Sequence, residues 1–141
     1  MPATISQATQ DAVVAAMVGN LQPEVRAEIF ADMTPRERRD TEAALARHSL
    51  RRRTAGRTWS TEKTTRLIIT PDLTVDLVPG DHGGWQIWAG EHLVLTTDGR
   101  WTPADLVYGV IPAGVVLEDH LDAATKWPTQ AAAVKAICAT L

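Results

Sequence analysis

Apolar residues in the first third of the chain recur at intervals of three and four positions, a spacing that predicts amphipathic helices. Ser6 is suited to cap a first helix that ends near Val18, where Gly19 and Asn20 would provide a left-handed stop. A second helix is expected to begin at Pro23, because proline is favoured in the first helical position. The large apolar side chains of these two helices include Ile5, Val13, Met17, Val25, Ile29, Phe30 and Met33.

Residues 34–37, with the sequence Thr-Pro-Arg-Glu, carry the strongest local signal in the chain. A threonine followed three residues later by a glutamate forms a capping box, in which each side chain satisfies a backbone N–H group of the other. This signal predicts a third helix that runs to about Arg53 and is polar nearly all round. We therefore expect residues 1–56 to form a helical arm whose apolar stripes need a further surface to bury against.

The hydrophobic period changes to two from about residue 64, which predicts strands. Turn-forming pairs separate the segments: Pro71-Asp72, Gly90-Glu91 and Asp98-Gly99. The predicted strands are 66–70, 73–78, 85–89, 92–97 and 100–101. Because each strand follows its neighbour through a short connection, they predict an antiparallel meander of four to five strands.

Three further elements are expected after the meander. They are a short helix from a Thr102 cap to about Tyr108, a short strand at residues 115–117, and a C-terminal helix capped by Thr129. The C-terminal helix has an apolar stripe that should cover one face of the sheet. The predicted fold class is α+β, with the helical arm followed by an antiparallel sheet and a packed C-terminal helix in residues 57–141.

Charge is distributed unevenly along the 141 residues, although the net charge is only −3. Residues 1–66 carry 11 Lys and Arg against 8 Asp and Glu, whereas residues 67–141 carry 3 against 9. Opposite patches on one molecule are complementary, so such a chain can pair head to tail with itself or present a positive face to an acidic partner.

The number of cysteines and the hydropathy of the chain argue against disulfide-stabilised, zinc-binding and membrane-spanning proteins. The one cysteine, Cys138, cannot close an intramolecular disulfide or build a four-cysteine zinc site, and it lies on an apolar helical stripe typical of a core position. No apolar run approaches the roughly 18 to 20 residues that cross a bilayer, and the first residues lack the basic region of a signal peptide. We expect a cytoplasmic protein without membrane contact.

A cluster of arginines at the end of the third predicted helix is the candidate nucleic-acid site. Arg51, Arg52, Arg53 and Arg57 could bind phosphate oxygens, and the neighbouring Trp59 could stack on a base. Cations in the last helical turn are also favoured by the helix dipole alone. The acidic net charge argues against nucleic acid, because proteins that bind through phosphate contacts are usually basic as whole domains.

Catalytic chemistry has weaker support. Imidazole and carboxylate groups could converge from two loops, at Asp81, His82, His92, Glu118, Asp119 and His120. Their spacing matches no metal-binding or hydrolase motif. We therefore predict no catalytic residue, no metal, no cofactor and no small-molecule substrate.

Tryptophan is the least average feature of the composition, with five residues against one tyrosine and one phenylalanine. Trp85 and Trp88 are three residues apart on one predicted strand, so their side chains lie on opposite faces of the sheet. Trp88 therefore points away from the core if Trp85 points into it. An outward indole is either covered by another element of the chain or lies at a contact with a partner, where tryptophan is enriched.

The leading hypothesis is a small non-enzymatic protein-interaction module: an adaptor, regulator or assembly component that binds another protein or a second copy of itself. Compact chains without motifs suggest a phage or mobile element as the source. The predicted interface residues are Val13, Met17, Val25, Ile29, Phe30 and Trp88. The alternative is a nucleic-acid-associated regulator that uses the arginine cluster and Trp59.

Overall fold

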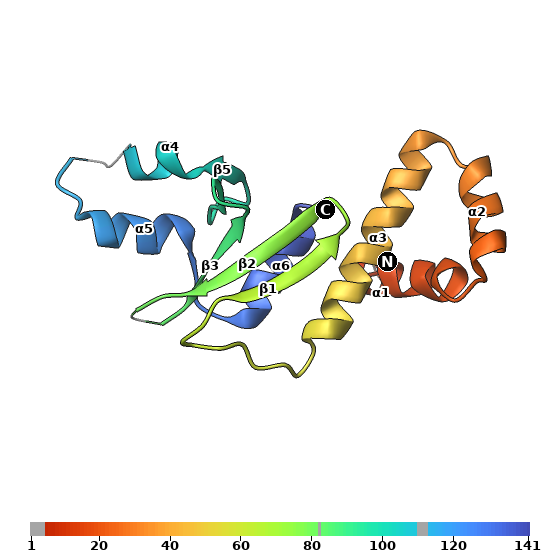
Figure 1. The fold of residues 1–141 in the computed structure, drawn as a ribbon, viewed down its shortest axis with the longest axis horizontal. Coiled ribbons are helices and arrows are strands. Elements are labelled where there is room, and N and C mark those ends of the chain that lie inside the picture. Colours follow the sequence, from red (N-terminus) through yellow and green to blue (C-terminus); the bar gives the residue numbers. More distant parts are fainter. Residues whose placement is uncertain (1–4, 82, 110–112) are drawn as a thin grey trace. The chain divides into compact units, whose positions relative to one another are not determined.

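The computed structural model describes residues 5–81, 83–109 and 113–141, and its contacts divide the chain into two compact units (Figure 1). The helical unit comprises the residues up to Ala55 together with Leu141, and the sheet unit comprises Gly56–Thr140. The helical unit contains α1 (Gln7–Val14), the π-helical turn η1 (Ala15–Gly19), α2 (Pro23–Asp32) and α3 (Pro35–Thr54). The three predicted N-terminal helices are thus confirmed.

The capping side chains act as the sequence predicts. The Ser6 hydroxyl accepts a hydrogen bond from the Thr9 backbone N–H at 3.2 Å. The Thr34 hydroxyl accepts from the Glu37 N–H at 3.1 Å, while the Glu37 carboxylate accepts from the Thr34 N–H at 3.3 Å, which completes the capping box. Each cap satisfies N–H groups that have no partner within the helix.

The predicted left-handed stop after the first helix is wrong. Asn20 has φ −97° and ψ 1°, and Gly19 is not among the glycines with positive φ. The helix instead continues through Gly19 as a π-helical turn. Packing does not require a glycine here, because a Cβ atom at this position would lie 3.7 Å from a methyl group of Leu45 on α3, an ordinary contact distance.

The sheet unit contains an antiparallel meander in the order β1-β2-β3-β4-β5, and a sixth short strand, β6, pairs with β3. Its strands are β1 (Thr65–Thr70), β2 (Leu73–Pro79), β3 (Trp85–Ala89), β4 (Leu93–Leu95), β5 (Trp101–Pro103) and β6 (Lys126–Trp127). Its helices are α4 (Ala104–Gly109), α5 (Leu117–Thr125) and α6 (Gln130–Ala139). The α+β fold class and the meander are confirmed.

One predicted strand, at residues 115–117, is wrong. Val116 is the N-cap of α5 and Leu117 is its first residue. The run of β-branched residues resembled a strand locally, but the following acidic residues and the i, i+4 spacing of Leu117 and Leu121 continue as an amphipathic helix. The sequence reading therefore missed α5.

The core of the sheet unit lies between the meander and α6, which contacts β3 and β6. Alternating residues of the strands are buried, as an antiparallel sheet with one covered face requires. Trp59 packs edge to face on Trp85, with ring centroids 5.7 Å apart. The buried apolar residues among those described are Trp59, Leu67, Ile69, Val75, Leu77, Ile87, Val94, Leu95, Val107, Ala133, Ala136, Ile137 and Cys138. The C-terminal helix on the sheet and the core position of Cys138 are thus confirmed.

Membrane-spanning structure was also sought among the helices of residues 5–81, 83–109 and 113–141. None of them combines the length and the apolar composition that a bilayer span requires.

Candidate protein-interaction site

The apolar side chains predicted to form an interface are exposed in the helical unit. Val13 is 51% exposed, Met17 68%, Val25 44% and Ile29 36%. Phe30 is half-buried, and the guanidinium of Arg26 lies 5.4 Å from the centre of its ring. Most of these predicted interface side chains are therefore only partly covered in the described structure.

Helix α2 is the least packed of the helices in this unit. It contains no buried residue. Its contacts to α3 are at its C-terminal end, where Arg38 donates to the Phe30 carbonyl at 2.9 Å and the Thr41 hydroxyl contacts the Met33 sulfur at 3.8 Å. Val25 and Ile29, one turn apart, form an exposed ridge beside the acidic residues of the same helix.

A groove of about 550 Å³ lies on the helical unit between α1–η1 and α3. Small residues on α1–η1 leave it open, because no long side chain reaches across to α3. Its α3 side carries one imidazole and two guanidinium groups, and none of the described residues that line it is acidic. We call this the basic groove; its lining residues are Ala12, Ala15, Ala16, Gly19, Asn20, Leu45, His48, Ser49, Arg52 and Arg53.

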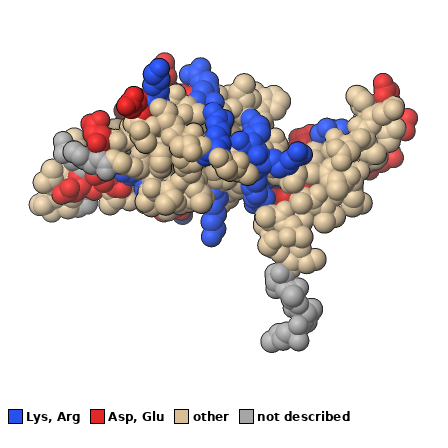
Figure 2. Space-filling model, turned by 90° about the horizontal axis from the view of Figure 1, so that it is seen from below, with Lys and Arg blue, Asp and Glu red and all other residues tan. Residues whose placement is uncertain are grey.

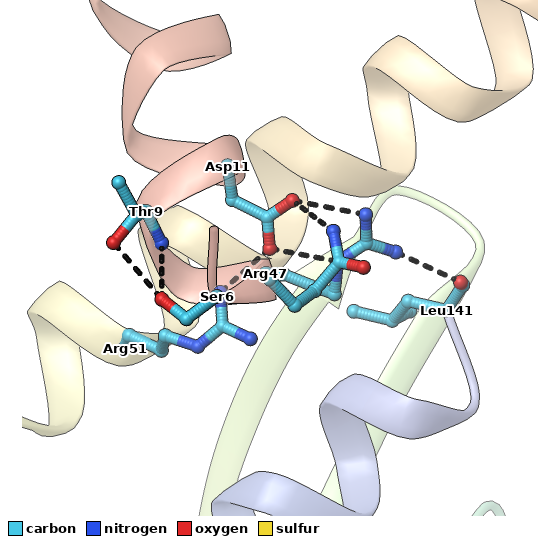
Figure 3. A network of polar contacts seen from close by, with 7 residues as sticks. Ser6, Thr9, Asp11, Arg47, Arg51 and Leu141 are labelled. Atoms are coloured by element: carbon cyan, nitrogen blue, oxygen red, sulfur yellow. Dashed lines mark hydrogen bonds and ion pairs between the residues drawn. The ribbon is translucent and has the colours of Figure 1, made fainter. Parts of the chain in front are cut away.

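An ion-pair cluster holds α1 against α3 next to the basic groove (Figure 3). The carboxylate of Asp11, only 1% exposed, accepts hydrogen bonds from Arg47 at 2.9 and 3.0 Å and from Arg51 at 2.6 Å. Gln7 donates a fourth bond at 2.8 Å, and Arg47 also donates to the Leu141 main-chain oxygen at 3.1 Å. The buried charge is therefore fully paired.

The electrostatics of this cluster follow from two opposing effects. Burial raises the pKa of the Asp11 carboxyl, but hydrogen bonds from Arg47, Arg51 and Gln7 and the positive charge of Arg47 outweigh it. The pKa falls from 3.8 to about 2. Asp11 is thus a structural carboxylate that stays ionised over the physiological range.

The structure divides the predicted nucleic-acid site. Arg51 forms an ion pair with Asp11, whereas Arg52, Arg53 and Arg57 are exposed. Figure 2 draws the exposed Lys and Arg side chains in blue. Trp59 is only 2% exposed and packs on Trp85. The prediction that Trp59 stacks on a base is wrong, because its ring faces are enclosed in the core of the sheet unit.

Trp88, the remaining predicted interface residue, lies on β3 and is half-buried. Its indole N–H donates to the Gln86 side-chain oxygen at 3.2 Å, and Gln86 in turn donates to the Thr125 hydroxyl at 2.8 Å. The polar end of the indole therefore has a partner within the sheet unit. Its role at an interface stays a prediction.

The sequence reading missed a second exposed apolar surface, on α4 and α5. These helices contact each other at one end of the sheet unit (Figure 1). The exposed apolar residues of this region, which we call the α4–α5 surface, are Leu106 (59% exposed) and Tyr108 (40%) on α4, Val115 (41%) and Val116 (62%) just before α5, and Leu117 (41%) at its start. The sequence does set this region apart by its charge, because residues 104–125 contain four acidic residues and no Lys or Arg.

The candidate catalytic residues are not brought into one site. Asp81 and His92 are exposed, and His120 lines a pocket of about 290 Å³ together with Asp98. His82 and the side chain of Glu118 lie outside the described residues. Within the part of the chain that the structure describes, no three His, Cys, Asp or Glu side chains are grouped to hold a metal ion.

Three comparisons with known proteins add no family. Family models, curated protein sequences and solved structures all give no match to this chain.

Proposed function

We propose that this protein is a small non-enzymatic assembly module that works by binding other protein chains, with a second copy of itself as partner. The observation that carries the proposal is the uncovered apolar surface of the helical unit. Helix α2 buries none of its residues, and Val13, Met17, Val25 and Ile29 are all exposed. Several large apolar side chains exposed on neighbouring helical segments are more often a protein contact than a single exposed residue is.

Charge supports a second copy as the partner. The excess of basic residues lies in the first half of the chain and the excess of acidic residues in the second half. Exposed apolar side chains occur in both units. Two copies therefore offer each other complementary charge together with apolar surface, which is the combination that orients protein association.

The magnitudes indicate that Val13, Met17, Val25 and Ile29 are not sufficient for tight association. Full burial of a Val, Ile or Met side chain stabilises by about 1.5–3 kcal/mol. Because these four side chains are already partly covered, they contribute roughly half of that each. Association costs roughly 4–15 kcal/mol in lost freedom, so further contacts are needed for a stable complex.

A concentration series tests the proposal. Sedimentation velocity of the full chain should show a mass that rises with protein concentration. The double substitution Met17→Ser and Val25→Ser should weaken the association, because it removes apolar contact area without touching the core. Ile68→Ser is the matched control, since Ile68 is 62% exposed but lies on β1 in the sheet unit.

A strictly monomeric chain at every concentration would contradict the proposal. The nucleic-acid alternative retains Arg52, Arg53 and Arg57 but has lost Arg51 and the stacking tryptophan. It predicts a complex with duplex or single-stranded DNA at about 50 mM salt that dissociates steeply as salt rises. A gel shift under those conditions, in a chain that does not self-associate, would favour that function instead.

A further inference from the structure

The basic groove and the α4–α5 surface are two further surfaces, besides the exposed apolar residues of α1, η1 and α2, that the core packing leaves unexplained. Both are present on every copy of the chain, one on each unit. We propose that the basic groove of one copy receives the α4–α5 surface of a second copy, so that copies join head to tail. This inference rests on the proposed self-association and adds to it a contact separate from the exposed apolar residues of α1, η1 and α2.

The groove has a shape and a charge that fit an apolar, acidic occupant. Its α1–η1 wall consists of small side chains and its floor includes Leu45, so bulky apolar side chains can enter. His48 lies on its α3 side one turn before Arg52, and Arg53 directly follows Arg52. The nearby carboxylate of Asp11 pairs with Arg47 and Arg51 on the neighbouring ridge. None of the described residues that line the groove is acidic, so none of them neutralises the charges of Arg52 and Arg53.

The α4–α5 surface has the matching properties. Leu106 and Val116 are more than half exposed, and Tyr108, Val115 and Leu117 add further apolar area. Asp105 and Asp119 are exposed beside them, whereas Asp122 is paired with Lys126 at 2.8 Å. The surface therefore combines side chains large enough to fill the groove with carboxylates that can pair with Arg52 and Arg53.

Joining two different surfaces has a geometric consequence. A contact in which one patch binds another is heterologous, so each added copy leaves one groove and one α4–α5 surface free at the ends. Such an assembly grows into a filament or closes into a ring. A symmetric contact through α2 would stop at two copies, because both partners would use the same patch.

Two complementary variants test the proposal in the full chain. The groove variant carries Arg52→Glu and Arg53→Glu, with Ala16→Trp as an independent, charge-neutral way to fill the groove. The surface variant carries Leu106→Ser and Val116→Ser; both side chains are exposed, and serine is a favoured N-cap at position 116. Arg36→Glu with Arg39→Glu, exposed on the same helix but outside the groove, is the control.

Each test variant alone should associate at least about tenfold more weakly than the native chain, and the control should not. A mixture of the Ala16→Trp variant and the surface variant should associate again and stop at one copy of each, because only one native pair of surfaces remains. Sedimentation velocity measures these masses, and circular dichroism confirms that each variant is folded.

Failure of this inference can be told apart from failure of the proposed function. If the native chain associates but the groove and surface variants associate equally well, or if their mixture stays monomeric, the head-to-tail contact is refuted while self-association stands. If the native chain never associates, both fail. Recovery of a one-to-one complex only in the mixture supports the contact, since a symmetric interface cannot produce it.

Discussion

Substitution of Asp11 by asparagine tests the claim that an ion-pair cluster holds α1 against α3. Asp11→Asn keeps the size of the side chain and removes its charge, so Arg47 and Arg51 lose the carboxylate that pairs them. The new amide nitrogen also presents a donor to the guanidinium donors. We therefore expect the helical unit to lose stability while its apolar contacts are preserved.

The magnitude follows from the pKa of Asp11. A pKa of about 2 in the folded chain, against 3.8 in the unfolded chain, corresponds to about 2.4 kcal/mol of stability at neutral pH. Removing one partner of a fully buried pair typically costs about 3–5 kcal/mol. Since the Arg47 and Arg51 side chains are 15% and 28% exposed and can regain some hydration, we expect a loss of about 2–3 kcal/mol.

The dependence on pH has a defined sign. The folded pKa lies below the unfolded value, so the carboxylate contributes its full stabilisation above about pH 5 and loses it as the pH falls through 2. The difference in unfolding free energy between the native chain and Asp11→Asn should therefore shrink to below about 0.5 kcal/mol at pH 2.

Urea unfolding at several pH values measures this difference. Far-ultraviolet circular dichroism follows the helices, whereas tryptophan fluorescence reports the sheet unit alone, because all five tryptophans lie there. Asp40→Asn on exposed α3 is the control and should change stability by less than about 0.5 kcal/mol. A similarly small effect of Asp11→Asn at neutral pH, or an effect that persists unchanged at pH 2, would refute the reasoning.

Three further substitutions test the elements that support these surfaces, each by urea or thermal unfolding. Thr34→Ala should cost about 1 kcal/mol, because it removes the acceptor for the Glu37 N–H, and Thr34→Ser should restore most of it. Leu77→Ala should cost about 2–5 kcal/mol, since the fully buried side chain leaves a cavity; a loss under about 1 kcal/mol would contradict its core position. Gly90→Ala should cost about 1–2 kcal/mol because φ is 68°, whereas Gly109→Ala should cost less.

Elements with their own local signals were predictable from the sequence. The capping box at Thr34, the serine cap at Ser6 and the turn at Pro71-Asp72 act over a few residues, so their outcome does not depend on the rest of the chain. The alternation of buried and exposed positions on β1 and β2 was predictable for the same reason.

Elements that depend on tertiary packing were not predictable. Gly19 follows an apolar run and looks like a helix stop, but its φ is not positive and the backbone continues through it as the π-helical turn η1. Strand β6 has only two residues and forms because Trp127 and Lys126 pair with Trp85 and Gln86 far away in the sequence. Helix α5 was obscured by the β-branched residues that precede it.

The candidate site was only partly predictable, because the sequence does not show whether a tryptophan such as Trp59 is buried or exposed. An exposed and a buried indole have the same sequence signature when the neighbouring residues are polar, as they are around Trp59. Burial was decided by Trp85 and by other distant residues of the sheet unit. The exposed apolar residues of α1 and α2 were predictable because amphipathic stripes followed by a polar helix leave too little apolar surface to cover them.

The geometry of a helix explains why the arginine run is not one site. Successive residues on a helix point about 100° apart, so Arg51 and Arg52 belong to different ridges, each shared with the residue one turn earlier. Arg47 and Arg51 form one ridge with Asp11 opposite, whereas His48 and Arg52 form the next with Ala12 and Ala16 opposite. The first ridge fixes α1 on α3 by charge, and this fixation positions the small residues that leave the second ridge open. Stability and the proposed binding therefore involve adjacent faces of the same two helices.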